Sequence, residues 1–296
     1  MRVLSLFDGM SCGRIALEQL GIPVDNYFAS EIDKNAIHIT MKNWRDTIQV
    51  GDIDNLDDFD LGEIDLLIGG SPCQGFSFSG KQLNFDDERS RLFFKYVYFL
   101  YKYKPKYFLL ENVVMKQEYQ DIISQYLGVK PIKINSSLVS AQSRNRLYWT
   151  NIPDVSQPAD RGILIKDILE KPIENYRTKN DDYIRPKIRK LLGNSKYSDN
   201  FKFRWDKDDR ILVTRPDGLK IQRIGRIAFP DNKSEIITVL TRPTFAFRKA
   251  TVLECERLQT VPDNYTEGVS DSQRYKMLGN GWTVEVIKHI FKGMLW

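Results

Sequence analysis

The first half of the chain alternates short apolar runs with stretches of helical periodicity. The apolar runs have the length of β-strands and occupy residues 2–7, 27–32, 65–70 and 106–113. The stretches with apolar side chains at helical spacing occupy residues 13–21, 34–44 and 89–103. Strands that alternate with helices predict an α/β fold with a doubly wound, mostly parallel sheet.

Polar or otherwise unusual residues lie at the ends of these predicted strands. In the order of the strands they are Asp8 and Gly9, Glu31, Pro72 and Cys73, and Glu111. Ligands of doubly wound sheets bind beyond the carboxyl ends of the strands. We therefore expect these residues to share one ligand site at that edge of the sheet.

The pattern changes in the second half of the chain. Between about residue 156 and residue 250 the apolar runs are shorter, proline is more frequent, and basic and aromatic residues are interleaved. Residues 283–295 return to helical periodicity. We therefore predict a body made of residues 1–159 and 270–296, interrupted by a smaller domain at residues 160–269.

The composition is that of a soluble globular protein. Of the 296 residues, 42% are apolar and 28% are charged, as in ordinary soluble domains. No uncharged apolar run approaches the roughly 18 residues of a transmembrane helix, so we expect no membrane association. The start of the chain, MRVLSLFDG, is too short and too soon acidic for a signal peptide.

Cysteine and histidine are scarce. The chain has three cysteines at scattered positions, Cys12, Cys73 and Cys255, and two histidines. An odd, scattered set of cysteines indicates reduced thiols and a cytoplasmic location rather than a disulfide framework. Because no C-x-x-C motif is present, we predict no metal site.

The net charge of +5 conceals an uneven distribution. Residues 176–250 hold 19 Lys and Arg against nine Asp and Glu, a net charge of +10, so the remainder of the chain is net negative. A basic segment joined to an acidic body suggests a polyanionic partner such as nucleic acid. A solvated, lysine-rich surface would give the same count.

The sequence LFDGMSCG at residues 6–13 joins a predicted strand to a predicted helix through Gly9 and Gly13. Glycines let the backbone approach a ligand closely, and a helix N-terminus favours an anionic group. Glu31 follows Gly9 by 22 residues, near the spacing at which nucleotide-binding folds place an acid against ribose hydroxyls. Together they suggest a nucleoside-containing cofactor, although Glu31 could instead cap the next helix.

Cys73 lies among glycine, serine and proline in GGSPCQGFS, residues 69–77. A thiolate is a far better nucleophile than a thiol, and a cysteine in such a loop is a candidate nucleophile. The alternative is a small buried residue in a turn, which is the commoner role of a free cysteine.

Three further side chains are candidates for acid–base and anion chemistry. Glu111 closes an apolar strand, and partial desolvation there would raise its pKa and let it donate a proton to a ring nitrogen. Arg144 and Arg146 alternate, so on a strand they would face the same side and could hold a phosphate or polarise a carbonyl. The alternatives are a salt-bridged glutamate and surface arginines.

The order of the motifs is more specific than any one of them. Along the chain they are FDGMSCG, SEID, GDI, GGSPCQGFS, ERSRLFF, FLLENV, QSRNRLYW, RKATVLECERLQTVPD and LGNGWTVEV. In this order, over nearly the whole chain, they closely resemble the motifs of the cytosine-C5 DNA methyltransferases. FDG, RLFF and LGNGW are similar to the mammalian de novo enzymes, and PCQGFS, RNR and ECERLQ to bacterial restriction-modification enzymes.

The resemblance implies the Rossmann-like fold of the class I methyltransferases, with S-adenosylmethionine as cofactor and double-stranded DNA as partner. It implies that Cys73 attacks C6 of a flipped-out cytosine, that Glu111 contacts N3 and N4, and that Arg144 or Arg146 supports O2. The expected cofactor-binding residues are Phe7, Asp8, Gly9, Ser11, Glu31, Ile32, Asp52, Ile53, Pro72, Asn280 and Trp282.

The resemblance also assigns the basic insert. Residues 160–269 would be the target-recognition domain, with arginines and lysines on phosphates and some side chains on base edges. The cell would be a bacterium or a phage-infected bacterium, and a cognate restriction endonuclease is a candidate partner.

Three departures from the family pattern stand out. Ser11 stands where many bacterial members have a second glycine, Val252 and Leu253 replace a common Pro-Arg, and Gly281 and Trp282 replace the usual Ser-Val. None of them removes a catalytic group.

Two other functions fit much of the same sequence. One is the same chemistry on a transfer RNA cytosine, and the other is a catalytically inactive DNA-binding regulator. The loop sequence QGFS and the basic insert favour DNA, and the intact set of Cys73, Glu111 and the two arginines favours an enzyme.

Overall fold

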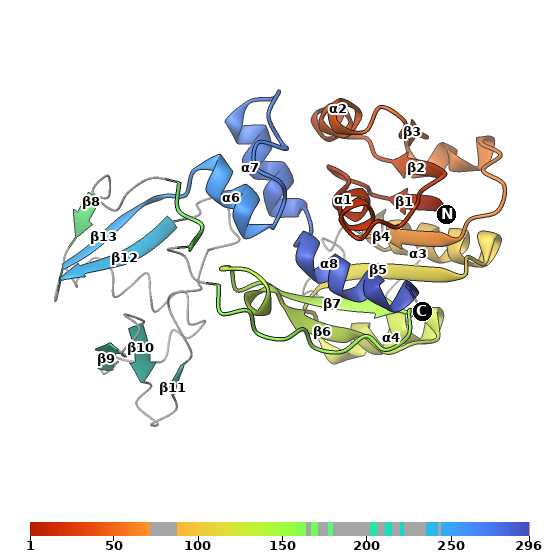
Figure 1. Cartoon of the computed structure of the whole chain (residues 1–296). Coiled ribbons are helices and arrows are strands. Elements are labelled where there is room, and N and C mark those ends of the chain that lie inside the picture. The colour runs from red at the N-terminus through yellow and green to blue at the C-terminus, as the bar shows by residue number, and fades with distance from the viewer. Residues whose placement is uncertain are drawn as a thin grey trace.

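A seven-stranded sheet with helices on both faces forms the body of the molecule in a computed structural model of the chain (Figure 1). The structure describes residues 1–71, 88–163, 167–170, 177–179, 202–205, 211–214, 220–221, 235–241 and 244–295. The sheet consists of β1 (Arg2–Leu6), β2 (Asn26–Ser30), β3 (Ile48–Gln49), β4 (Leu66–Gly69), β5 (Tyr107–Val113), β6 (Ile132–Asn135) and β7 (Asn145–Thr150).

The strands lie in the order β3-β2-β1-β4-β5-β7-β6. Pairing is parallel from β3 through β5, whereas β7 is antiparallel to both β5 and β6. The order reverses at β1, which has β2 on one side and β4 on the other. Such a reversal opens a crevice at the carboxyl ends of the strands, where doubly wound sheets bind their ligands.

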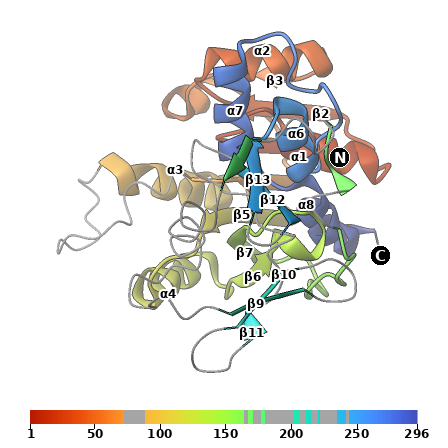
Figure 2. The ribbon, with the colours of Figure 1, turned by 90° about the vertical axis from the view of Figure 1, so that its left-hand side faces the viewer.

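Helices cover both faces of the sheet. On one face pack α1 (Cys12–Gln19), α2 (Lys34–Asn43) and α8 (Val284–Phe291), and on the other pack α3 (Glu88–Tyr103) and α4 (Gln117–Leu127). Figure 2 shows α1 and α8 on one side of the strands and α3 and α4 on the opposite side. The fold is therefore the three-layer α/β arrangement that the sequence predicts.

Successive residues of the central strands enter different cores. In β4, Leu66 and Ile68 pack with α1 and α8, whereas Leu67 between them packs with α3. Side chains alternate between the two faces of a strand, so a strand covered on both faces must be apolar at every position. This requirement explains why the central strands are continuous apolar runs in the sequence.

The predicted elements of the first half are confirmed with small shifts at their ends. Residues 2–7, 27–32, 65–70 and 106–113 overlap the strands β1, β2, β4 and β5, and the three predicted helices are α1, α2 and α3. The late helical stretch, residues 283–295, contains α8 and the short 3₁₀ helix η7 (Lys292–Met294).

The described strands between residues 177 and 249 form two three-stranded antiparallel sheets, β11-β10-β9 and β12-β13-β8. Their bounds are β8 Arg177–Lys179, β9 Lys202–Trp205, β10 Ile211–Thr214, β11 Lys220–Ile221, β12 Glu235–Thr241 and β13 Thr244–Lys249. Figure 1 shows these strands away from the seven-stranded sheet, on the side that carries α6 (Val252–Leu258).

The chain rejoins the body directly after β13. Ala250, Cys255, Leu258 and Tyr265 are buried in the same core as α1 and α8. α6 begins with a capping box, in which Thr251 and Glu254 each accept a hydrogen bond from the backbone N–H of the other. The predicted boundaries of the insert stay a prediction, and this packing favours an end near residue 249 rather than residue 269.

Across the residues that the structure describes, no helix combines the length and the apolar composition that crossing a bilayer would require.

Candidate active site

A cavity of about 650 Å³ opens where the loops after β1, β2, β4 and β5 meet the segment between α7 (Asp271–Asn280) and α8. It lies at the reversal of strand order, the expected ligand position in this fold. The sequence-predicted residues that line it are Phe7, Asp8, Gly9, Glu31, Ile32, Asp52, Ile53, Glu111, Arg144, Arg146, Asn280 and Trp282.

The loop after β1 has a strained backbone. Phe7, Gly9 and Ser11 all lie in the left-handed region, with φ angles of 56°, 60° and 61°. Residues other than glycine seldom adopt this conformation, and such strain concentrates at functional sites. Ser11 thus occupies a backbone position that suits glycine, which is the residue that many members of the resembled family have there.

Ser11 does not line the cavity but supports the residue that does. Its hydroxyl donates a hydrogen bond to Asp8 and lies 2.9 Å from the hydroxyl of Thr40. Asp8 also accepts a hydrogen bond of 2.8 Å from the hydroxyl of Tyr27. Burial raises the pKa of Asp8 to about 6, against the opposing effect of these hydrogen bonds.

The Glu31 side chain is held by backbone N–H groups from the loop after β1 and from the residues that follow Glu31. Its Oε2 accepts the N–H of Gly9 at 2.7 Å, and its Oε1 accepts the N–H groups of Ile32 and Asp33 at 2.8 Å each. A carboxylate offers about four acceptor positions, so these bonds leave capacity for a ligand donor. The residue that caps α2 is Asp33, which accepts the N–H of Asn35, and not Glu31.

The 3₁₀ helix η1 (Ile53–Asp58) supplies the next part of the wall. Asp52 caps it by accepting the N–H of Asp54 at 3.0 Å. Ile32, which also lines the cavity, is 70% exposed. This part of the cavity therefore combines carboxylates with accessible apolar surface, which suits a flat heterocycle that carries hydroxyl or amine donors.

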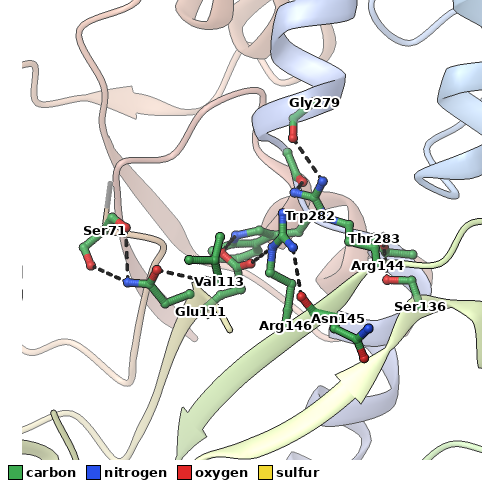
Figure 3. Close-up of polar contacts among 12 residues, drawn as sticks. Ser71, Glu111, Val113, Ser136, Arg144, Asn145, Arg146, Gly279, Trp282 and Thr283 are labelled. Atoms are coloured by element: carbon green, nitrogen blue, oxygen red, sulfur yellow. Dashed lines mark hydrogen bonds and ion pairs between the residues drawn. The ribbon is translucent and has the colours of Figure 1, made fainter. Parts of the chain in front are cut away.

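Glu111 on β5 lines another part of the cavity wall, with both carboxyl oxygens engaged (Figure 3). Its Oε1 is 2.9 Å from Nε of Arg146, and its Oε2 accepts the indole N–H of Trp282 at 3.1 Å. Burial raises the pKa of Glu111, and Arg146, Arg144 and Trp282 oppose that rise. A carboxyl group poised in this way can hold or donate a proton at a bound base.

Arg144 has a different task from Arg146. Its guanidinium group donates to the backbone carbonyls of Gly279 at 3.1 Å and Gly281 at 2.9 Å (Figure 3). Arg144 is buried, and burial lowers its pKa. The two arginines therefore reach the same cavity, as their alternation predicts, but Arg144 anchors the segment before α8 while Arg146 pairs with Glu111.

The nucleophile candidate Cys73 and the neighbouring Pro72 lie outside the described residues. The last described residue before them is Ser71, which is buried. Its carbonyl and hydroxyl accept hydrogen bonds from the side-chain amide of Asn112, at 3.4 Å and 3.2 Å. Asn112 follows Glu111 on β5, so the start of the cysteine-bearing stretch is fastened beside Glu111.

Sequence reasoning missed several residues of the cavity wall, among them Cys12, Asp33 and Lys276. Asp33 and Lys276 form an ion pair of 2.7 Å between the residue before α2 and α7. Asp33 follows Glu31 closely and could have been found from that spacing. Lys276 sits in a helix far along the chain, and no sequence signal links it to the cavity.

Solved structures share the fold over the whole chain. A protein encoded within an E. coli prophage matches with a TM-score of 0.67 and 20% identity, over 100% of this chain and 98% of its own. The Dnmt2 methyltransferase of S. pombe matches with a TM-score of 0.58 and 17% identity, over 100% of both chains. At these identities the likeness concerns the fold alone.

Sequence relatives also span the chain. The type II methyltransferase M1.ScrFI of Lactococcus lactis subsp. cremoris is 30% identical over 99% of this chain and 78% of its own length. The type II methyltransferase M.NlaX of Neisseria lactamica is 30% identical over 99% of this chain and 96% of its own. The orphan methyltransferase M.SPRI of Bacillus phage SPR is 25% identical over 100% of this chain and 97% of its own.

The family model for C-5 cytosine-specific DNA methylases matches residues 1–296. Together with the doubly wound fold and the cavity at its strand ends, this match establishes that the chain belongs to the C-5 cytosine-specific DNA methylases, the DNA (cytosine-5-)-methyltransferases.

Proposed function

We propose that the protein transfers a methyl group from S-adenosylmethionine to C5 of a flipped-out cytosine in double-stranded DNA, through a covalent bond between Cys73 and C6 of the base. The observation that supports this most directly is the pairing of Glu111 with Arg146 in the same cavity that Glu31 and Asp52 line. One cavity thereby offers a place for a nucleoside cofactor and a place for a base.

The residues of the first wall fit the cofactor. Glu31 and Asp52 present carboxylates to ribose hydroxyls and to the adenine amine, and Phe7, Ile32 and Ile53 present apolar surface to the ring. When bound, S-adenosylmethionine supplies the methyl group that C5 accepts. The fixed orientation of Glu31, set by three backbone N–H groups, means that little ordering remains to be done on binding.

The residues of the second wall fit the base. Attack of the Cys73 thiolate on C6 breaks the aromaticity of cytosine and makes C5 a nucleophile. Glu111 would contact N3 and N4 and stabilise that state. After C5 has gained the methyl group, a base removes the C5 proton, and the thiolate then leaves. Since C6 is inaccessible inside a duplex stack, the target nucleotide must be flipped out.

Arg146, rather than Arg144, is the arginine that we assign to the base. Its Nε is paired with Glu111 beside the cavity and its Nη1 donates to the carbonyl of Asn145, whereas both terminal nitrogens of Arg144 are bound to backbone carbonyls of the segment before α8. Arg144 would therefore act by holding the segment that carries Trp282.

The target would be recognised by the basic stretch between the two parts of the body. We name residues 171–249 the recognition segment, a narrower stretch than the predicted 160–269, because the chain is packed in the body again from Ala250. A cognate restriction endonuclease stays a prediction, suggested by the type II relatives.

A trapping experiment tests the covalent step. DNA that carries 5-fluorocytosine at the target position cannot release fluorine as a cation, so the reaction should halt after methylation with the enzyme attached. We expect a denaturation-resistant adduct with the wild-type enzyme and none with C73S, because a serine hydroxyl is far less ionised near neutral pH. Duplex DNA and total transfer RNA, tested in parallel with ordinary cytosine, separate the DNA substrate from the RNA alternative.

The other two cysteines are the matched controls. Cys12 is buried, and burial raises its pKa to about 12, while Cys255 is buried in the core. C12S and C255S should therefore still form the adduct. An adduct that survives C73S, or a wild-type enzyme that methylates DNA yet never traps, would remove Cys73 from the role of nucleophile.

A further inference from the structure

Trp282 connects the cofactor cavity with Glu111. It is one of the residues by which the sequence departs from the family pattern, and it lies in the segment between α7 and α8. Its side chain lines the cavity, and its indole N–H is directed at Glu111 (Figure 3). The departure therefore places a hydrogen-bond donor, in addition to an apolar ring, against the carboxyl group proposed to act on the base.

The two oxygens of Glu111 have donors of different kinds. Arg146 provides a cation at Oε1, at 2.9 Å, and Trp282 provides a neutral N–H at Oε2, at 3.1 Å. Two donors on opposite oxygens fix the plane of a carboxyl group, which one donor alone leaves free to rotate. A proton taken up by Glu111 would be placed on Oε2, since the cation beside Oε1 opposes protonation there.

The residues around the indole leave room for its contact with Glu111. A Cβ atom added at Gly70 would lie 3.0 Å from Nε1 of Trp282 and 3.1 Å from Oε2 of Glu111. The glycine directly after β4 therefore makes room for this hydrogen bond. On the other side, the carbonyl of Gly281, the residue before Trp282, accepts hydrogen bonds from Arg144 and Gln259. The position of the indole is thus set from both sides.

We propose that Trp282 is a positioning residue for Glu111, whose indole N–H holds Oε2 while Arg146 holds Oε1, so that the carboxyl group faces the place of the target base in one orientation. This inference rests on the proposed function for its catalytic meaning. The contact also acts on protonation, because an N–H donor stabilises the ionised carboxylate.

Among the residues that the structure describes, several titratable groups act on the charge of Glu111. Arg144 and Arg146 oppose the rise of its pKa, and Tyr148 on β7 and Cys12 at the start of α1 interact with its charge. Burial raises the pKa of both Tyr148 and Cys12, so they stay neutral through the range in which Glu111 titrates. A change in the titration of Glu111 on altering Trp282 would therefore report the indole contact.

The test is an infrared titration of the Glu111 carboxyl group in the free enzyme. The signal of this group is the difference between the spectra of each protein and of the same protein with the additional substitution E111Q. W282F keeps a ring in place and removes the N–H donor. We expect the midpoint of protonation to move to higher pH by about one unit, the order of effect of one hydrogen bond to a charged group. W44F is the matched control, since it removes an indole N–H that Trp44 donates to Tyr265 and not to Glu111.

A second variant acts without touching the indole. G70A places a methyl group against both partners and should shift the midpoint in the same direction. In wild type and W282F, the pH limb of methyl transfer that Glu111 controls should move with the infrared midpoint. Superimposed titrations of wild type, W282F and G70A would overturn the proposal. The titration needs neither cofactor nor DNA, so its outcome is independent of whether the wild-type enzyme methylates DNA. A failure to methylate DNA would overturn the proposed function and not this inference about Trp282.

Discussion

Glu31 accepts three backbone N–H groups, from Gly9, Ile32 and Asp33. The side chain therefore shapes the cofactor cavity as well as offering it an acceptor. Its replacement should affect both ligand binding and the stability of the loops that it joins.

The variant E31A should bind S-adenosylmethionine about ten- to a hundredfold more weakly, as expected for loss of hydrogen bonds to a charged acceptor. It should also melt at a lower temperature, because three N–H groups lose their acceptor. Titration calorimetry and scanning calorimetry measure the two effects. E118A, on the exposed surface of α4, is the control. Unchanged cofactor affinity in E31A would move the ribose contact to another residue.

Asp8 gives the stability a pH dependence. Its pKa rises from 3.8 to about 6 on burial in the fold, so the folded state favours the protonated form. The resulting stabilisation is complete below about pH 4 and is lost as the pH rises through about 6. The loss amounts to at most on the order of 3 kcal/mol.

Urea unfolding of wild type and D8N at a series of pH values isolates this contribution. The free energy of unfolding of wild type, relative to that of D8N, should fall between about pH 4 and pH 6 and be constant above. A difference that is flat over this range would show that Asp8 does not titrate there.

At the scale of elements, the segment between α7 and α8 depends on an arginine from a distant part of the chain. Arg144 precedes β7 and binds the carbonyls of Gly279 and Gly281. R144A should lower the free energy of unfolding by about 2–3 kcal/mol, because the carbonyls of Gly279 and Gly281 lose a charged donor whose side chain is buried. R146A should cost less stability and reduce the rate of methyl transfer more strongly.

Urea unfolding and single-turnover kinetics, run on both variants, separate the two roles. The assignment fails if R146A unfolds as readily as R144A while keeping the wild-type rate.

The elements were largely predictable, because strands covered on both faces must be apolar throughout, as Leu66, Leu67 and Ile68 are. The reversed direction of β7 was not, since periodicity does not encode strand direction. Among site residues, those directly after strands, such as Asp8 and Glu31, could be predicted from the topology of the fold. Ser11 was predicted to bind the cofactor; its hydroxyl donates to Asp8, which lines the cavity. Lys276 and the indole contact of Trp282 arise from tertiary packing.

For the whole molecule, the uneven charge predicts how DNA is bound. Residues 176–250 carry a net charge of +10, and removal of one phosphate-binding cation should flatten the logarithmic salt dependence of DNA affinity by about 0.9. Substitution of Lys and Arg residues of this stretch by Gln, singly and in groups, should reduce the slope. The control substitutions K104Q and K106Q change two exposed lysines between α3 and β5 and should leave the slope unchanged. Fluorescence anisotropy over a range of salt concentrations measures the slope, and an unaltered slope would make the basic stretch ordinary surface.

The two ends of the recognition segment are attached to the body next to each other. Just before it, the N–H of Glu170 donates to Glu254 and the carbonyl of Ile168 accepts from Arg257, both on α6. Just after it, Ala250 is buried in the same core as Ile168. Inserted domains whose termini lie close together are tolerated and exchanged readily. If the segment reads the target as proposed, we expect that recombination between related genes could exchange it and create a new sequence specificity in a single event, with the catalytic machinery inherited unchanged.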